Sequence, residues 1–284
     1  MKLNVLKNYF SDTLGNIYPK TEVDTFFFLL IEEYLGFQRI DTVLKAEFEI
    51  GKEQFIKFEA AITRLKKEEP IQYIIGKTEF YGLPFLVNEN TLIPRPETEE
   101  LVEWVIEEVK NLDNSKEIKI LDIGTGTGCI PIALAKKLQN VHISAIDISK
   151  EALNTAKKNA DLNKVSIHFI ECNILKTEKL EETFDIIISN PPYVRNLEKA
   201  EIKNNVLDFE PHSALFVSDK RPLIFYDKIA ELAKISLRKK GLLFFEINQY
   251  LPKETVMNIE KKGFKNVVLR KDLFGNYRMI KAEL

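Results

Sequence analysis

The chain has 284 residues, 45% of them hydrophobic and 30% charged, which is the balance of a folded globular protein and excludes a disordered or fibrous one. Its 41 Lys and Arg residues against 43 Asp and Glu residues give a formal charge of −2, which argues against a global positive field that would hold a nucleic-acid backbone. Two cysteines exclude a disulfide framework. The three histidines, His142, His168 and His212, are scattered along the chain, so no metal site is predicted and each is interpreted as an edge or packing residue.

The first residues, MKLNVLKNYFSD, interrupt their apolar side chains with Asn and Lys, unlike the continuous apolar stretch of a signal peptide. The longest obvious apolar run, from Phe26 to Ile31, is too short to cross a bilayer. We therefore expect a cytoplasmic protein in a reducing compartment, with no membrane partner.

Residues 1–70 contain few Gly or Pro, and their apolar residues recur at three and four positions, as in Phe55, Phe58 and Ile62. This spacing is typical of amphipathic helices. The segment is slightly acidic, with 10 basic against 12 acidic residues over positions 1–75. The sequence predicts a small all-α domain over residues 1–70 that suits a protein partner better than a phosphate backbone.

Residues 71–96 read IQYIIGKTEFYGLPFLVNENTLIPRP. Aromatic and β-branched residues alternate here with turn residues, which are Gly76, Gly82, Pro84 and Asn88. This pattern predicts a β-hairpin linker over residues 71–96.

Residues 97–284 are expected to form an α/β domain. A helix pattern runs to about Lys110, and continuously apolar strands then alternate with helices such as 130–138 and 151–160; the strands are 118–124, 142–147, 165–171, 184–190 and 241–248. Strands this apolar are usually buried on both faces of a parallel sheet. Two further strand-like runs flank Gly275 and predict an antiparallel hairpin that closes the sheet.

A glycine-rich loop follows the first predicted strand of this sheet, with the sequence DIGTGTG over residues 122–128. Its glycines allow a tight turn and a close approach of the backbone to a ligand, and the next helix presents unpaired N–H groups. Asp147 ends the second strand, nineteen residues past Gly128, where a carboxylate accepts hydrogen bonds from ribose hydroxyls. A nucleoside cofactor is therefore expected.

The loop by itself fits both NAD and S-adenosylmethionine. Cys129 stands where the third glycine of the dinucleotide fingerprint GxGxxG is expected, and Asp122 precedes the first glycine. A carboxylate there suits the ammonium group of a methionyl moiety and would repel a pyrophosphate. The pattern favours S-adenosylmethionine, and an NAD dehydrogenase stays a weaker alternative because no acid or base for a hydride site is evident.

The sequence Asn-Pro-Pro-Tyr, residues 190–193, directly follows the fourth strand, on the sheet edge where α/β proteins bind ligands. The amide oxygen of Asn190 and the carbonyl oxygen of Pro191 can accept the two hydrogens of a planar NH2 group. Pro192 stiffens the site, and the ring of Tyr193 can cover the group. No His, Cys or metal set stands nearby to activate the nitrogen, so positioning, with Asn190 and Tyr193 as the catalytic candidates, must provide most of the catalysis.

These motifs resemble the release factor glutamine methyltransferases, which methylate the glutamine nitrogen of the Gly-Gly-Gln motif in class 1 peptide-chain release factors. The resemblance rests on the segments 69–105, 122–135, 188–194, 208–216 and 271–284. It implies a Rossmann-like class I S-adenosylmethionine methyltransferase sheet over residues 97–284 and a helical amino-terminal domain that helps to grip the release factor. It also implies that the glutamine binds to Asn190, Pro191, Pro192 and Tyr193. The implied cofactor-binding residues are Asp122, Gly124, Thr125, Gly126, Thr127, Gly128, Asp147, Asn173, Ile174 and Asn190.

Three departures or ambiguities accompany the resemblance. Asn173 stands where the family has an acidic residue facing the adenine, and Ile174 replaces a bulky residue, so altered cofactor affinity is expected. Residues 217–222 replace a glycine-rich stretch, which puts the loop conformation in question. Arg95 and Glu97 match family motif residues, and an ion-paired junction is at least as good an interpretation of them as catalysis.

Two other functions share part of these patterns. An amino methyltransferase acting on adenine or cytosine in DNA or RNA would use the same loop and NPPY sequence, but needs a phosphate-gripping surface that the charge does not favour. A regulatory module that binds a nucleoside without turnover has no evident need for an NH2-shaped acceptor site.

Overall fold

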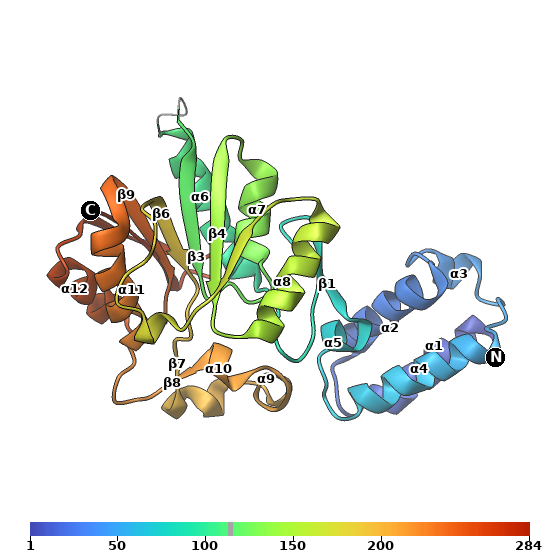
Figure 1. The fold of residues 1–284 in the computed structure, drawn as a ribbon. Helices are drawn as coiled ribbons and strands as arrows, with labels where there is room; N and C mark the ends of the chain where they lie inside the picture. Colours follow the sequence, from blue (N-terminus) through green and yellow to red (C-terminus); the bar gives the residue numbers. More distant parts are fainter. Residues whose placement is uncertain (113–115) are drawn as a thin grey trace. The chain divides into compact units, whose positions relative to one another are not determined.

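The computed structural model describes residues 1–112 and 116–284, and these divide into two compact units (Figure 1). The first unit contains Met1–Gly76 together with Asn204–Phe209. The second unit contains Lys77–Lys203 and Glu210–Leu284. No helix in the described part of the chain has both the length and the apolar character that a membrane span requires.

The first unit is helical, which confirms the predicted all-α fold of the amino-terminal residues. Its elements are α1 (Leu3–Leu14), α2 (Lys20–Leu35), α3 (Asp41–Leu44), α4 (Lys52–Leu65), α5 (Ile71–Ile75) and α9 (Asn204–Phe209). The apolar faces of α1, α2 and α4 form its core, with Phe10, Phe27 and Phe58 fully buried. Helix α2 ends at Gly36, whose φ of 65° is the left-handed conformation that favours glycine at this position.

The predicted hairpin is shorter than residues 71–96. Strands β1 (Lys77–Phe80) and β2 (Leu83–Leu86) pair antiparallel and are joined at Tyr81 and Gly82. The prediction was wrong for residues 71–75, which form helix α5 and not part of a hairpin. The reason is packing, since Ile71 and Ile74 are buried in the core of the first unit.

A seven-stranded sheet organises the second unit, in the order β10-β11-β9-β6-β3-β4-β5. Its strands are β3 (Ile118–Ile123), β4 (Val141–Asp147), β5 (His168–Glu171), β6 (Phe184–Ser189), β9 (Leu237–Glu246), β10 (Lys265–Lys271) and β11 (Tyr277–Glu283). Strands β5, β4, β3, β6 and β9 are parallel, whereas β11 pairs antiparallel with β9 and with β10. The predicted Rossmann-like sheet with an antiparallel terminal hairpin is thus confirmed.

Helices cover both faces of this sheet, as the continuous apolar strands predicted (Figure 1). Alternate residues of one strand point to opposite faces, so Ile120 packs with Trp104 on one side and Leu121 packs with Tyr226 on the other. The helices of the second unit are α6 (Pro96–Lys110), α7 (Cys129–Lys137), α8 (Lys150–Asn163), α10 (His212–Leu215), α11 (Ile224–Ser236) and α12 (Pro252–Lys261). Short elements complete it: η1 (Ile174–Lys176), β7 (Val194–Arg195), η2 (Asn196–Glu201) and β8 (Phe216–Val217).

Candidate functional site

A cavity of about 390 Å³ opens at the carboxyl ends of β3, β4 and β6. Strand β3 has β4 on one side and β6 on the other, so the strand order reverses here, which is where open α/β sheets bind ligands. The volume lies in the range of small-molecule sites. Residues that follow the strands line the cavity, among them Gly124, Gly126, Asp147, Asn173, Ile174 and Asn190.

The glycine loop has two different duties. Gly124 and Gly126 line the cavity with φ values of 78° and 54°, which few other residues adopt. Gly128 caps the start of α7 and does not line the cavity. A Cβ atom on Gly128 would lie 3.1 Å from Ala156 Cβ and 3.1 Å from Ile132 Cδ1, so this glycine lets α7 pack closely against α8.

The Asp147 carboxylate is held in place on the cavity wall. Its two oxygens accept the N–H groups of Gly126 at 2.8 Å and of Ser149 at 2.9 Å. Burial raises the pKa of Asp147, and these backbone donors oppose the shift. Each carboxylate oxygen keeps further acceptor capacity, so the side chain can still accept hydrogen bonds from a ligand.

Asp122 at the end of β3 and the loop residues Thr125 and Thr127 are buried and are not among the cavity-lining residues. Both oxygens of Asp122 lack a hydrogen-bond partner within residues 1–112 and 116–284. Burial is the main reason that the pKa of Asp122 is raised to about 7, and the nearby Thr125 hydroxyl opposes the shift. An unpartnered buried carboxylate beside the loop suits a cationic group, and this observation fits the ammonium of a methionyl moiety.

Asn173 and Ile174 both line the cavity, after the end of β5. The Asn173 side-chain oxygen accepts the N–H of Leu175 at 3.1 Å and so caps the short helix η1. That oxygen keeps a second lone pair, so Asn173 can offer a ligand both an acceptor and its amide N–H donors.

A smaller cavity of about 50 Å³ adjoins the first, and Asn190 and Pro191 line both. Pro192 lines the larger cavity, whereas Tyr193, Arg95 and Glu246 line the smaller one. The NPPY segment therefore forms the boundary between a cavity of cofactor size and a cavity of side-chain size.

A chain of hydrogen bonds fixes the NPPY side chains. Asn190 Nδ2 donates to Thr98 Oγ1 at 3.2 Å, and Thr98 Oγ1 donates to Glu246 Oε2 at 2.6 Å. The Tyr193 hydroxyl donates to Glu246 Oε1 at 2.9 Å. Because its nitrogen is engaged by Thr98, Asn190 keeps its amide oxygen as an acceptor. Burial raises the pKa of Glu246, and the donors from Thr98 and Tyr193 oppose the shift.

Thr98 and Glu246 were not predicted as site residues. Thr98 lies in the first turn of α6, inside a segment that carries the family resemblance, and Glu246 ends the apolar strand β9. The position of an acidic residue at the carboxyl end of a buried strand was the available signal for Glu246.

Arg95 forms an ion pair inside the second unit, not at a junction between the two units. Its guanidinium contacts the buried carboxylate of Glu210 at 2.5 Å, and the other oxygen of Glu210 accepts the Ile93 N–H at 3.2 Å. Glu97 lies in the first turn of α6. The 217–222 segment is also structured, because Val217 ends β8 and the Asp219 carboxylate accepts the Leu197 N–H at 3.1 Å.

Comparisons with known proteins agree with this geometry. The chain matches the model of the methyltransferase small domain over residues 108–209 and the model of the PrmC N-terminal domain over residues 8–76. It is 56% identical to the release factor glutamine methyltransferase of Flavobacterium psychrophilum, over 98% of this chain and 99% of that protein. It is 41% identical to the protein of the same description from Bacteroides thetaiotaomicron, over 99% of each chain.

A solved methyltransferase structure from Pyrococcus furiosus is similar with a TM-score of 0.50 and 20% sequence identity. The similarity covers 79% of this chain and 96% of that one. At this identity the comparison supports the fold alone.

Proposed function

Because this chain belongs to the family of release factor glutamine methyltransferases, we propose that it methylates the side-chain amide nitrogen of the glutamine in the Gly-Gly-Gln motif of class 1 peptide-chain release factors. The methyl donor in this proposal is S-adenosylmethionine. The observation that carries it is the position of Asn190 and Pro191, which line both the larger and the smaller cavity. A carboxamide in the smaller cavity would meet the donor at this boundary.

The larger cavity is the proposed site of S-adenosylmethionine, which supplies a methyl group on a positively charged sulfur when it is bound. Asp147 would accept hydrogen bonds from the ribose hydroxyls, and Gly124 and Gly126 would allow the backbone to approach closely. Asp122 would balance the ammonium charge from the end of β3. Asn173 and Ile174 would contact the adenine, with the Asn173 side-chain oxygen accepting from the adenine amino group. Thr125, Thr127 and Gly128 would act by holding the loop and α7.

The smaller cavity is the proposed site of the glutamine side chain. Asn190 Oδ1 and the Pro191 carbonyl oxygen would accept the two hydrogens of the amide, which orients the nitrogen and stabilises the positive charge that develops on it. Thr98 and Glu246 keep the Asn190 amide from rotating, through the two hydrogen bonds described above. Glu246 also holds the Tyr193 hydroxyl, so the ring can cover the amide.

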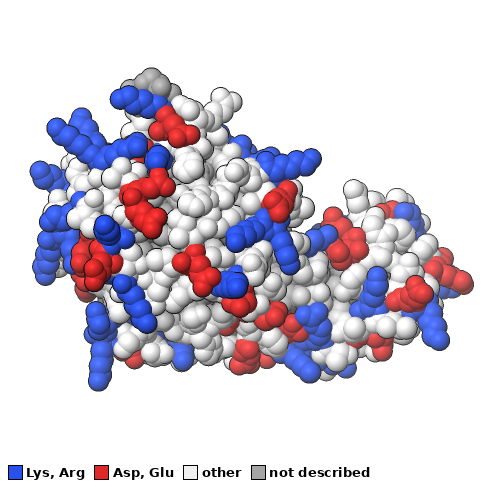
Figure 2. Space-filling model, in the orientation of Figure 1, with Lys and Arg blue, Asp and Glu red and all other residues white. Residues whose placement is uncertain are grey.

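Charge gives no support to the alternative of DNA or RNA base methylation. The chain carries a formal charge of −2, and Figure 2 shows acidic and basic side chains interspersed on the face that it presents. A duplex-binding enzyme would gain affinity from a basic surface. The cytoplasmic location inferred from the sequence stays a prediction.

The test is to incubate the protein with labelled S-adenosylmethionine and one substrate at a time: a purified class 1 release factor, its Gln→Ala variant in the Gly-Gly-Gln motif, and duplex DNA. We expect label in the unaltered release factor alone. Label in DNA but not in the release factor would overturn the proposal in favour of base methylation.

Asn190→Ala is expected to lower the rate of this transfer about 10- to 100-fold, since an unpaired amide hydrogen costs about 1–3 kcal/mol. The matched control is Asn111→Ala, at the exposed end of α6, which should transfer methyl groups at the unaltered rate. Equal rates for the two variants would remove Asn190 from the mechanism.

A further inference from the structure

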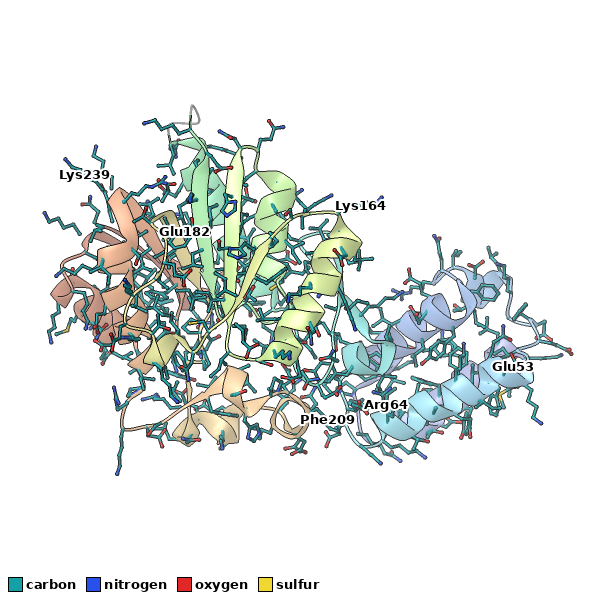
Figure 3. The ribbon with its side chains drawn as sticks, in the orientation of Figure 1. Glu53, Arg64, Lys164, Glu182, Phe209 and Lys239 are labelled. Atoms are coloured by element: carbon teal, nitrogen blue, oxygen red, sulfur yellow. The ribbon has the colours of Figure 1, made fainter. Side chains whose placement is uncertain are left out.

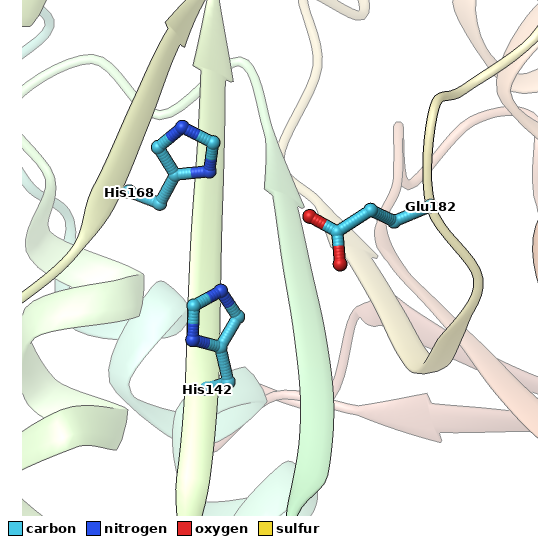
Figure 4. Close-up of side chains that lie close together, drawn as sticks. All are labelled: His142, His168 and Glu182. Carbon is cyan, nitrogen blue, oxygen red and sulfur yellow. The ribbon is translucent and has the colours of Figure 1, made fainter.

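Three side chains with metal-binding donors meet at the end of the sheet opposite the two cavities. His142 lies at the start of β4, His168 begins β5, and Glu182 lies just before β6 (Figure 4). Figure 3 places Glu182 in the same half of the second unit as Lys164 and Lys239, away from β7 and β8. Sequence spacing gives no sign of this cluster, because each residue comes from a different segment.

Strand register explains why the two histidines share a face. His168 pairs with Ser144, which is two residues after His142 on β4, so both imidazoles project from the same side of the sheet. Glu182 reaches them from the segment that connects η1 to β6 (Figure 4). One ligand atom from each of the three residues lies within 4.8 Å of the other two.

The donor set is that of a transition metal. Two imidazole nitrogens and one carboxylate oxygen form a zinc site that leaves a fourth position open to water. Tetrahedral bonds of about 2.1 Å separate neighbouring ligand atoms by about 3.4 Å, so modest rotamer changes are needed to close the cluster. Such changes are available, because His168 is exposed and His142 and Glu182 are only half-buried.

Lys119 is the competing cation. It is paired with His142 in the strand register, and its ammonium group bonds to Glu182 Oε2. Ser144, in register with His168, carries a buried hydroxyl oxygen without a hydrogen-bond partner in the described residues. This face of the sheet therefore carries, beside the two histidines, a buried hydroxyl group that makes no contribution to the apolar core.

We propose that His142, His168 and Glu182 bind a divalent transition metal such as Zn²⁺. The metal would tie the segment before β6 to the amino-terminal ends of β4 and β5. The metal would take no part in the methyl transfer, since the cluster lies at the opposite end of the strands from the NPPY segment. Binding would displace Lys119 from Glu182 or share the carboxylate with it.

The experiment titrates Zn²⁺ into the untagged, chelator-treated full chain by isothermal calorimetry, and bound zinc is counted by mass spectrometry after desalting. We expect one equivalent per chain and a higher melting temperature. His142→Ala and His168→Ala should each weaken binding by more than about 100-fold, because even outer-shell partners of metal ligands contribute about 10- to 100-fold. No binding to the unaltered chain would overturn the proposal.

Matched variants separate this site from adventitious binding. Glu182→Gln should weaken zinc binding, whereas Glu181→Gln, its exposed neighbour, should not. His212→Gln tests the remaining histidine and should also bind as the unaltered chain does. Lys119→Met should bind zinc more tightly because the competing ammonium is gone. If the double variant His142→Ala/His168→Ala keeps the full affinity while remaining folded by circular dichroism, the proposal is wrong.

Discussion

The side-chain amide of Asn190 offers an oxygen acceptor and a nitrogen donor, and the Thr98 hydroxyl determines that the oxygen is the one free to contact a substrate. Thr98 accepts from the Asn190 nitrogen and donates to Glu246, so the amide oxygen is left for a substrate. The carboxylate behind Thr98 is 1% exposed and cannot exchange this donor for bulk water. Specificity for an NH2 group thus depends on a residue that does not itself line either cavity.

Thr98→Val should lower kcat for glutamine methylation about tenfold or more. The substitution keeps the shape but removes both hydrogen bonds, and a buried unpaired polar group costs about 1–3 kcal/mol. Calorimetry with S-adenosylmethionine should give an unchanged Kd, because the cofactor cavity is intact. Thr255→Val, which removes another buried hydroxyl in α12, should leave kcat unaltered. A loss of cofactor affinity without a loss of kcat would contradict the assigned role.

Asp122 makes stability depend on pH in a direction that is unusual for a carboxylate. Its pKa is raised from 3.8 to about 7 by burial, so between these pH values the folded chain holds a proton that the unfolded chain releases. The free energy of unfolding therefore falls as pH rises through this window. The loss of unfolding free energy is complete above the pKa of Asp122 in the folded chain and is absent below its pKa in the unfolded chain.

Asp122→Asn should remove this pH dependence, since an amide does not ionise. Relative to the unaltered chain, the variant should gain more unfolding free energy at about pH 8 than at about pH 5 in urea titrations. An identical difference at the two pH values would show that Asp122 is not buried in its protonated form.

At the scale of elements, the glycine loop couples a ligand site to the packing of two helices. Gly128 combines a φ of 78° with the close contact of α7 and α8, whereas Gly275 has a φ of 85° in the β10–β11 turn with nothing within 4 Å of a Cβ. Both glycines have the left-handed backbone conformation, but only Gly128 has neighbouring atoms that an added Cβ atom would crowd. Their comparison isolates the packing contribution.

Gly128→Ala should therefore destabilise the second unit more than Gly275→Ala does. The left-handed conformation costs about 1–2 kcal/mol at either position, and overpacking adds about 1–3 kcal/mol at Gly128. Urea denaturation followed by tryptophan fluorescence measures both, because Trp104 is buried in the core of that unit. Equal losses would mean that α7 and α8 shift apart at little cost.

At the scale of the whole molecule, every residue that lines the two cavities belongs to the second unit. The first unit has a separate core built on α1, α2 and α4. The sequence predicts that the helical amino-terminal domain recognises the protein substrate, so this prediction can be tested separately from cofactor binding.

A chain that begins at Lys77 should bind S-adenosylmethionine with a Kd within about threefold of the full chain, or about 0.65 kcal/mol. Its kcat/KM for a release factor should fall much further, since the truncation removes α1 to α5, the helices that the sequence predicts to recognise a protein partner, and leaves only α9 of the first unit. Calorimetry and the labelled methyl transfer measure these values, and circular dichroism confirms folding. Loss of cofactor affinity in a folded truncated chain would refute the separation.

Local patterns located the strands of the seven-stranded sheet to within about four residues, because strand burial depends on neighbouring residues. They missed the short strands β7 and β8 and the first residues of β9, from Leu237 to Lys240. The resemblance of segments such as the glycine loop and NPPY also led to the family. The prediction that residues 71–75 belong to a hairpin was wrong, because a short apolar run fits a strand or a helix equally well. Burial of Ile71 and Ile74 in the core of the first unit favours the helix.

Only the tertiary structure brings together residues that are far apart in the chain. Thr98, Asn190 and Glu246 meet through α6, β6 and β9. His142 and His168 meet through the register of β4 and β5, and Glu182 reaches them from the segment before β6. Such contacts depend on how whole helices and strands pack together, so they cannot be predicted from the spacing of residues within one segment. The sequence determined which chemical groups each side chain offers. Only the tertiary structure determined which other side chains those groups contact.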